Sequence, residues 1–212
     1  RDLRMSRGLG DVYKRQIYEQ QAHEQGFALV CGVDEAGAGP LMGPLYAAAV
    51  ILPEQFDLPG LNDSKKLTEK KREALFPLIQ QQAVAWAVAS VSAREIDETD
   101  ILSARMRAMQ LAIDGLSVRP ELALIDGNRD HGRTAAIMTP HRCIGDVDAL
   151  SASIAAASIL AKVSRDRYVC DVLDKQYPEY QFARHKGYGT KAHYAAVDEL
   201  SLIHISEPTR HA

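Results

Sequence analysis

Short apolar runs alternate with amphipathic segments along this chain, a pattern typical of an α/β fold. Two apolar runs, at residues 27–33 and 45–52, predict neighbouring strands joined by a glycine-rich turn, and a run at residues 83–91 predicts a third strand. Two later runs, at residues 122–125 and 137–138, predict shorter strands. We therefore expect a mixed β-sheet.

Apolar residues at helical spacing predict the helices that flank this sheet. Between residues 100 and 116 the apolar positions alternate between spacings of four and three, which places them on one face. The segment after residue 151 opens with Ala, Ser and Ile, and small residues there would let a helix approach the sheet closely. The periodic segments predict helices at residues 17–25, 68–82, 100–116, 151–175 and 191–200.

A length of 212 residues suits one domain with a sizeable core. Residues 1–16 and 201–212 continue no predicted element, and both resemble translated sequencing-adapter text. We expect these two segments to be non-native, with genuine disordered termini as the alternative. Residues 17–200 would then form the single functional domain.

The composition, 46% hydrophobic and 25% charged, is ordinary for a soluble globular protein. No apolar stretch is long enough to span a membrane, and no secretory signal is evident. The three cysteines form no Cys-x-x-Cys pair, which favours free thiols in a reducing cytoplasm. The net charge of −3 argues only weakly against nucleic acid, because basic residues gather in local clusters.

Acidic residues stand where apolar runs give way to Gly or to a helix start, at Asp34, Glu35, Asp126 and Asp148. In an α/β fold, strand ends bring such side chains together. Acids that converge without basic partners cannot all stay ionised, and hard divalent cations such as Mg²⁺ or Mn²⁺ are their natural partners. Two ions about 3.5–4 Å apart can hydrolyse a phosphodiester, so these residues indicate a metal-dependent nuclease.

Each acid also has a purely structural interpretation. Neighbours on a regular strand point to opposite faces, so Asp34 and Glu35 share one site only if the strand ends there. Otherwise Glu35 would act through its backbone or a bridging water. Asp126 before Gly127 also fits a tight turn, and Asp148 also fits a helix N-cap.

Five motifs in order make the chain similar to one known family. They are Gly32-Val-Asp-Glu-Ala-Gly-Ala-Gly-Pro-Leu41, Leu61-Asn-Asp-Ser-Lys-Lys-Leu67, Ile125-Asp-Gly-Asn128, Ile154-Ala-Ala-Ala-Ser-Ile-Leu-Ala-Lys-Val163 and His185-Lys-Gly-Tyr-Gly-Thr190. With them, residues 27–200 resemble ribonuclease HII, the type 2 ribonuclease H family. The resemblance implies an RNase H-like fold with a C-terminal helical extension. It also implies Mg²⁺- or Mn²⁺-dependent cleavage of RNA joined to DNA, with nucleic acid as the partner.

The resemblance also implies roles for particular residues. The acids Asp34, Glu35, Asp126 and Asp148 would hold the metals, and cleavage would leave 3′-hydroxyl and 5′-phosphate ends.

For substrate binding, the backbone of Gly37, Ala38 and Gly39 would read the 2′-hydroxyl, which distinguishes RNA from DNA. Tyr188 would stack on a sugar at the RNA–DNA junction and direct incision to the 5′ side of the ribonucleotide; a core ring is the alternative. Lys65 and Lys66 would contact the phosphate backbone, or else only approach a helix in solvent.

Weaker candidates for phosphate contacts are Lys162, Arg165 and Lys186.

This chain departs from the family pattern at two places. The family usually has Arg at the position of Ala38, so a cationic contact to phosphate would be missing and substrate binding weaker. Before Asp148 the family usually has Gly, where this chain has Val147. Gly145-Asp146 could be the family's Gly-Asp pair, which would make Asp146 the ligand, although the spacing to Ile154 favours Asp148.

Two other interpretations stay open. The sister family ribonuclease HIII usually carries an extra N-terminal domain, for which the residues before Phe27 leave no room. A hybrid-binding module without catalysis would fit the departures but not the complete set of acids. We expect a cytoplasmic, monomeric enzyme with no membrane contact.

Overall fold

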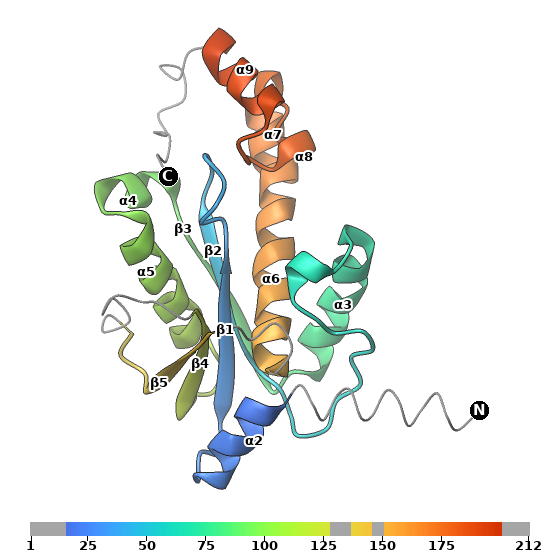
Figure 1. Cartoon of the computed structure of the whole chain (residues 1–212), viewed down its shortest axis with the longest axis vertical. Helices are drawn as coiled ribbons and strands as arrows, with labels where there is room; N and C mark the ends of the chain where they lie inside the picture. Colours follow the sequence, from blue (N-terminus) through green and yellow to red (C-terminus); the bar gives the residue numbers. More distant parts are fainter. Residues whose placement is uncertain (1–15, 128–136, 146–150, 201–212) are drawn as a thin grey trace, which may run out of the picture.

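The computed structural model describes residues 16–127, 137–145 and 151–200 of the 212-residue chain (Figure 1). These residues form a five-stranded sheet with the strand order β3-β2-β1-β4-β5. The strands are β1 (Val30–Ala36), β2 (Leu45–Ile51), β3 (Ala85–Val91), β4 (Leu122–Asp126) and β5 (His141–Ile144). Because β1 pairs antiparallel with β2 and parallel with β4, the sheet is mixed, as predicted.

Helices flank both faces of the sheet. The longer ones are α2 (Ile17–Glu24), α3 (Glu69–Gln82), α5 (Ile101–Asp114), α6 (Ala152–Tyr168) and α9 (Lys191–Leu200). The shorter ones are η1 (Ser64–Lys66), α4 (Ala93–Glu98), η3 (Val169–Leu173), α7 (Asp174–Gln176), η4 (Pro178–Tyr180) and α8 (Phe182–His185). In Figure 1, α4 and α5 lie on one side of the sheet, α3 and α6 on the other, and α7–α9 extend from the far end of α6. The α/β class with a C-terminal helical extension is confirmed.

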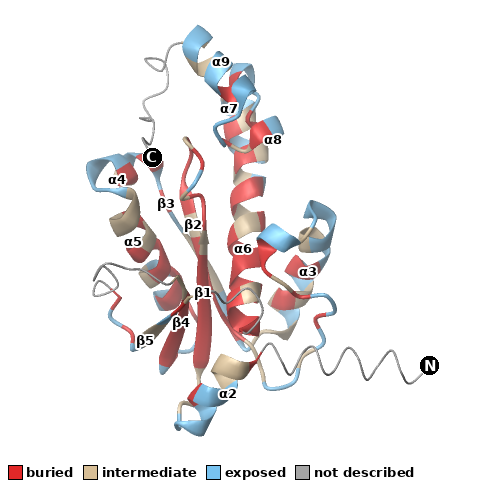
Figure 2. Cartoon of the chain, viewed as in Figure 1, coloured by how far each residue is buried: buried red, intermediate tan, exposed pale blue. Residues whose placement is uncertain are grey.

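Residues of β1 and β2 alternate between two cores, because successive strand side chains point to opposite faces. Val33 and Ala47 pack in the cluster that includes α5, whereas Ala36 and Ala48 pack in the cluster that includes α6. Both strands are therefore buried on both faces, as Figure 2 shows for the centre of the sheet. A polar side chain on these strands must find its partners inside the protein.

The first turn of α6 lies directly on β1 at Gly32. A Cβ atom at Gly32 would lie 2.2 Å from the backbone nitrogen of Ile154, so only glycine fits. The turn is capped on its other side: Ser151 Oγ accepts from Ile154 N at 3.2 Å, and Glu19 accepts from Ser153 N at 3.0 Å. The close approach predicted from the small residues of this helix is confirmed, and it fixes where α6 begins relative to β1.

Two local predictions differ from the structure. The strand predicted at residues 137–138 is wrong: Met138 is 82% exposed, its N–H donates to Gln110 Oε1 at 2.8 Å, and the fifth strand is β5. A second difference is that the long helix predicted at residues 151–175 changes to a π-helical turn, η3, after Tyr168. Within the described residues, no helix is long and apolar enough to cross a membrane.

Candidate active site

Asp34 and Asp126 occupy equivalent positions on two parallel neighbouring strands. The register pairs Val33 of β1 with Ile125 of β4, so the next residues on both strands are these two acids. Both side chains emerge on the face that α6 covers, because they alternate with Val33 and Ile125 of the α5-side core. Asp34 is only 3% exposed and Asp126 is half-buried. The predicted convergence of these two carboxyl groups is therefore confirmed.

The surroundings of this pair oppose full ionisation. Burial, followed by the charges of Glu35 and Asp126, raises the pKa of Asp34 well above its usual value. Burial and the charge of Glu35 also raise the pKa of Asp126, and Lys65 offsets part of that effect. Two hard oxygen donors held in this way suit a divalent cation, whose charge would relieve the repulsion.

Glu35 differs from the prediction, because β1 does not end at the acids. The strand continues through Ala36, paired with Tyr46 of β2, so Glu35 points toward the opposite face from Asp34. There its Oε1 lies 2.8 Å from Arg105 Nη2 of α5. The expectation that the acids lack basic partners is thus wrong for Glu35.

Arg105 was not predicted, although the sequence carried a signal for it. It falls on the stripe of α5 that faces the sheet, in line with Ile101 and Ala108, which pack in the α5-side core. A charged residue on an apolar stripe usually has a buried partner. Its Nε atom, like Oε2 of Glu35, is buried with no hydrogen-bond partner among the described residues.

Lys65 and Lys66 lie in η1, and both side chains are exposed. Burial lowers the pKa of the Lys65 ammonium, but the surrounding carboxylates, Asp34 first, raise it above its usual value. Lys65 therefore lies in the field of the acidic pair.

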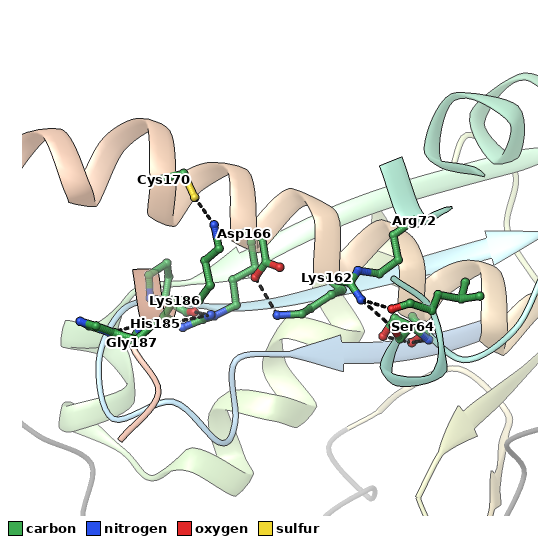
Figure 3. A network of polar contacts seen from close by, with 12 residues as sticks. Ser64, Arg72, Lys162, Asp166, Cys170, His185, Lys186 and Gly187 are labelled. Carbon is green, nitrogen blue, oxygen red and sulfur yellow. Dashed lines mark hydrogen bonds and ion pairs between the residues drawn. The ribbon is translucent and has the colours of Figure 1, made fainter. Parts of the chain in front are cut away.

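The short helix η1 is anchored on two sides. Ser158 Oγ of α6 donates to Ser64 Oγ at 2.7 Å and accepts from its N–H at 3.1 Å. On the other side, Arg72 Nη1 donates to the main-chain oxygens of Ser64 and Leu67, at 2.9 and 2.6 Å; Figure 3 shows Arg72 over Ser64. The two lysines are thus carried on a segment that is fixed to α6.

The turn after β1, residues 37–44, will be called the glycine loop. Gly37 has φ +111° and is buried, and Gly39 is exposed at the surface of the loop. Ala38 between them packs against the α5-side core. The predicted backbone-reading segment is thus a real turn, and its middle residue is half-buried.

Tyr188 lies beside this loop. The residue is 42% exposed, so the alternative of a core ring is wrong. A Cβ atom at Gly39 would be 3.7 Å from Tyr188 Cε1, and Lys162 Nζ lies 5.4 Å from the ring centre. An aromatic face, a loop backbone and a cation therefore meet at one surface, as sugar and phosphate recognition requires.

The three weaker candidates for phosphate contacts differ in burial and in their partners. Arg165 is fully buried, so its prediction as a phosphate contact is wrong. Lys162 Nζ pairs with Asp166 Oδ1 at 2.7 Å, and Lys186 Nζ donates to Cys170 Sγ; both contacts are drawn in Figure 3. Lys162 keeps its ammonium group beside the ring of Tyr188, a predicted substrate contact.

Asp148 and its alternative, Asp146, lie outside the described residues. Across the described ranges, no group of three or more His, Cys, Asp or Glu side chains is gathered so as to hold a metal ion. Two acids do converge on the face of the sheet that α6 covers. Mg²⁺ is commonly bound through one or two carboxylates completed by water and substrate phosphate, so this donor set fits such an ion.

Comparison with known proteins gives one consistent result. The family model for ribonuclease HII matches residues 31–211. The ribonuclease HII of Desulfitobacterium hafniense is 54% identical over 188 residues, which cover 88% of this chain and 70% of that protein. The ribonuclease HII of Aliivibrio salmonicida is 52% identical over 181 residues, 85% of each chain.

Solved structures agree with the sequence relatives. The crystal structure of ribonuclease H2 from Pyrococcus horikoshii matches with a TM-score of 0.67 and 29% identity, over 81% of this chain and 86% of that one. RNase HII from Archaeoglobus fulgidus, solved in complex with PCNA, matches with a TM-score of 0.70 and 26% identity, over 86% and 93%. The RNase H-like fold expected from the motifs is confirmed.

Proposed function

The chain belongs to the ribonuclease HII family, and from that premise we propose that it incises duplex DNA on the 5′ side of embedded ribonucleotides and cleaves the RNA strand of RNA–DNA hybrids. The products would carry 3′-hydroxyl and 5′-phosphate ends. The observation that carries the proposal is the buried Asp34 beside Asp126, with Lys65 in their field.

We propose that Asp34 and Asp126 are the central metal ligands, joined by Glu35 and Asp148. When bound, a pair of Mg²⁺ or Mn²⁺ ions would supply Lewis-acid stabilisation of the attacking and leaving oxygens. Burial of Asp34 fits this role, because a carboxylate that is costly to ionise alone gains most from a cation. Glu35 would first have to leave Arg105, or act from its own face through water.

The remaining residues would bind and orient the nucleic acid. Exposed Lys65 and Lys66 would hold phosphates, which position a duplex without reading sequence. The main chain of Gly37, Ala38 and Gly39 would approach the ribose, since a backbone without bulky side chains can reach the 2′-hydroxyl.

Tyr188 would lie against the next sugar and so identify the junction. Its half-exposed ring and its position beside Gly39 support this role.

The direct test is cleavage of a labelled DNA duplex that contains one ribonucleotide, with Mn²⁺ and then with excess EDTA. We expect a single cut on the 5′ side of the ribonucleotide, silence in EDTA and restoration by Mn²⁺ or Mg²⁺. Asp34→Asn should abolish the cut. Asp114→Asn, which changes an exposed acid at the end of α5, should leave it intact.

The other outcomes separate the alternatives. Cleavage of a long hybrid without cleavage at the single ribonucleotide would mean that the metal site works and junction reading fails. Binding of both substrates with cleavage of neither would favour a hybrid-binding module and would refute the proposed reaction.

A further inference from the structure

Arg165 of α6 is a fully buried cation whose hydrogen bonds go to main-chain oxygens. Its Nε donates to the Pro44 oxygen at 3.2 Å and its Nη2 to the Met42 oxygen at 3.1 Å. Its Nη1 donates to the Lys186 oxygen at 3.0 Å. A guanidinium stays charged in proteins and is costly to bury, so it must be satisfied from several directions at once.

The three accepting oxygens belong to two segments that are far apart in the sequence. Met42 and Pro44 are in the glycine loop, and Lys186 belongs to the turn that carries Tyr188, here called the Tyr188 turn (residues 185–190). The two segments also meet directly, because Leu41 N donates to the Gly187 oxygen at 2.9 Å. Figure 3 shows the turn residues Lys186 and Gly187 beside α6.

The backbone on both sides is shaped around this guanidinium. A Cβ atom at Gly37 would lie 2.6 Å from Arg165 Nε, and one at Gly187 would lie 2.7 Å from the Met42 oxygen. Lys186 itself has φ +53°, an uncommon conformation for a residue other than glycine. Such backbone geometry persists only where the surroundings hold it in place.

The proposed contacts to the substrate lie within these two segments. Gly37 and Gly39 belong to the glycine loop, and Tyr188 follows Lys186 and Gly187 in the turn. We propose that Arg165 is a positioning residue that joins the glycine loop and the Tyr188 turn into one rigid unit and thereby sets the preference for a single ribonucleotide–DNA junction. This inference rests on the proposed function and extends it to a residue that touches no substrate.

The effect should fall on substrate selection rather than on the metal site. The hydrogen bonds of Arg165 reach the two loops, whereas Asp34 and Asp126 are set by the pairing of β1 with β4. A duplex with one ribonucleotide offers one 2′-hydroxyl, which must meet both loop and ring correctly. A long hybrid offers a ribose at every position of its RNA strand. Its cleavage should therefore tolerate a looser connection between the glycine loop and the Tyr188 turn.

The test compares Arg165→Lys with Arg167→Lys. A lysine at 165 keeps the charge, but one ammonium cannot span three oxygens from two segments. Arg167 is the matched control, because it lies two residues further along α6, is exposed and pairs with Glu73.

For Arg165→Lys we expect kcat/KM to fall about 100-fold on the single-ribonucleotide duplex, since misplacement by about 1 Å can cost that much. On a long hybrid we expect a loss of only about tenfold. KM should change little on either, because phosphate contacts dominate affinity. The Mn²⁺ concentration for half-maximal rate should match the parent, and Arg167→Lys should leave both activities unchanged. An Arg165→Lys variant that is folded and keeps the parental ratio between the two substrates would overturn the inference.

Amide hydrogen exchange tests the coupling without any activity. In Arg165→Lys, exchange should accelerate together in the glycine loop and the Tyr188 turn, while β1 and β4 stay protected as in the parent. Faster exchange in one segment alone, or in neither, would refute the proposal that Arg165 joins the two segments into one rigid unit. If the unmutated chain cleaves neither substrate, the proposed function fails, and the exchange result still decides whether Arg165 couples the segments.

Discussion

Replacing Gly32 by Ala should lower the stability of the protein more than a methyl group added at any other position of β1. The new Cβ would lie 2.2 Å from the backbone of Ser153 and Ile154, whereas ordinary contacts begin at 3.4 Å. The first turn of α6 must therefore move away by about 1.2 Å, because neither obstacle is a flexible side chain that could turn aside. The sheet side cannot yield either, since β1 is paired on both edges.

The magnitude follows from this geometry. Overpacking a rigid core costs about 1–3 kcal/mol, and a clash of backbone with backbone belongs at the upper end. For a domain of this size, each kcal/mol lowers Tm by about 2–4 °C, so we expect a decrease of about 6–12 °C. The shift also moves the start of α6 relative to Asp34, and a displacement of about 1 Å can reduce kcat about 100-fold.

The assays are urea or thermal unfolding and metal-dependent cleavage of the single-ribonucleotide duplex. Gly60→Ala is the control: Gly60 has φ +78° but nothing within 4 Å of its added Cβ. It should cost about 1–2 kcal/mol of backbone strain and leave cleavage unchanged. Stability of Gly32→Ala within about 0.5 kcal/mol of the parent would refute the close approach. A Gly32→Ala variant that is less stable but fully active would refute the inference that the position of α6 relative to Asp34 controls cleavage.

Three further changes test the site. Because the pKa of Asp34 is raised by burial, then by Glu35 and Asp126, the metal-free protein loses stability as pH rises through that pKa. Asp34→Asn should therefore gain in urea midpoint over the parent as pH rises; a constant difference contradicts this. Ala38→Arg should lower KM about tenfold or more by adding a charged hydrogen bond, and an unchanged KM would exclude a missing phosphate contact. Arg105→Met frees Glu35 and should lower the Mn²⁺ concentration for half-maximal rate roughly fivefold; an increase would show that the pair supports the site.

Periodicity predicted the elements that are buried and regular. β1, β2, β3 and β4 are apolar runs, and α5 presents one apolar stripe to the sheet, so local pattern and tertiary burial agree. β5 was missed because it is an edge strand whose sequence, His-Arg-Cys-Ile, has no apolar alternation. Its pairing with β4 is decided by the neighbouring strand and not by its own residues.

The site was predictable where it depends on strand order alone. Asp34 and Asp126 follow buried runs in parallel neighbours, so their convergence follows from the α/β pattern. The direction of Glu35 depended on where β1 ends, and no residue between Asp34 and Gly37 marks that point. Arg165 was misjudged for a related reason: sequence shows a cation near other cations but not which carbonyl oxygens the fold will bring to it.

The separation of Asp34 from Glu35 has a physical consequence for the metal-free protein. Three carboxylates on one buried face would repel one another strongly, and a protein without bound cation would have to protonate them or distort. Placing Glu35 on the α5 face, against Arg105, keeps its carboxylate off the α6 face and gives it a cationic partner, although its charge still raises the pKa of both Asp34 and Asp126. Lys65 then offsets part of the remaining charge. In the proposed metal site Glu35 would exchange Arg105 for a metal or a bridging water, and breaking that ion pair would then be part of the cost of metal binding.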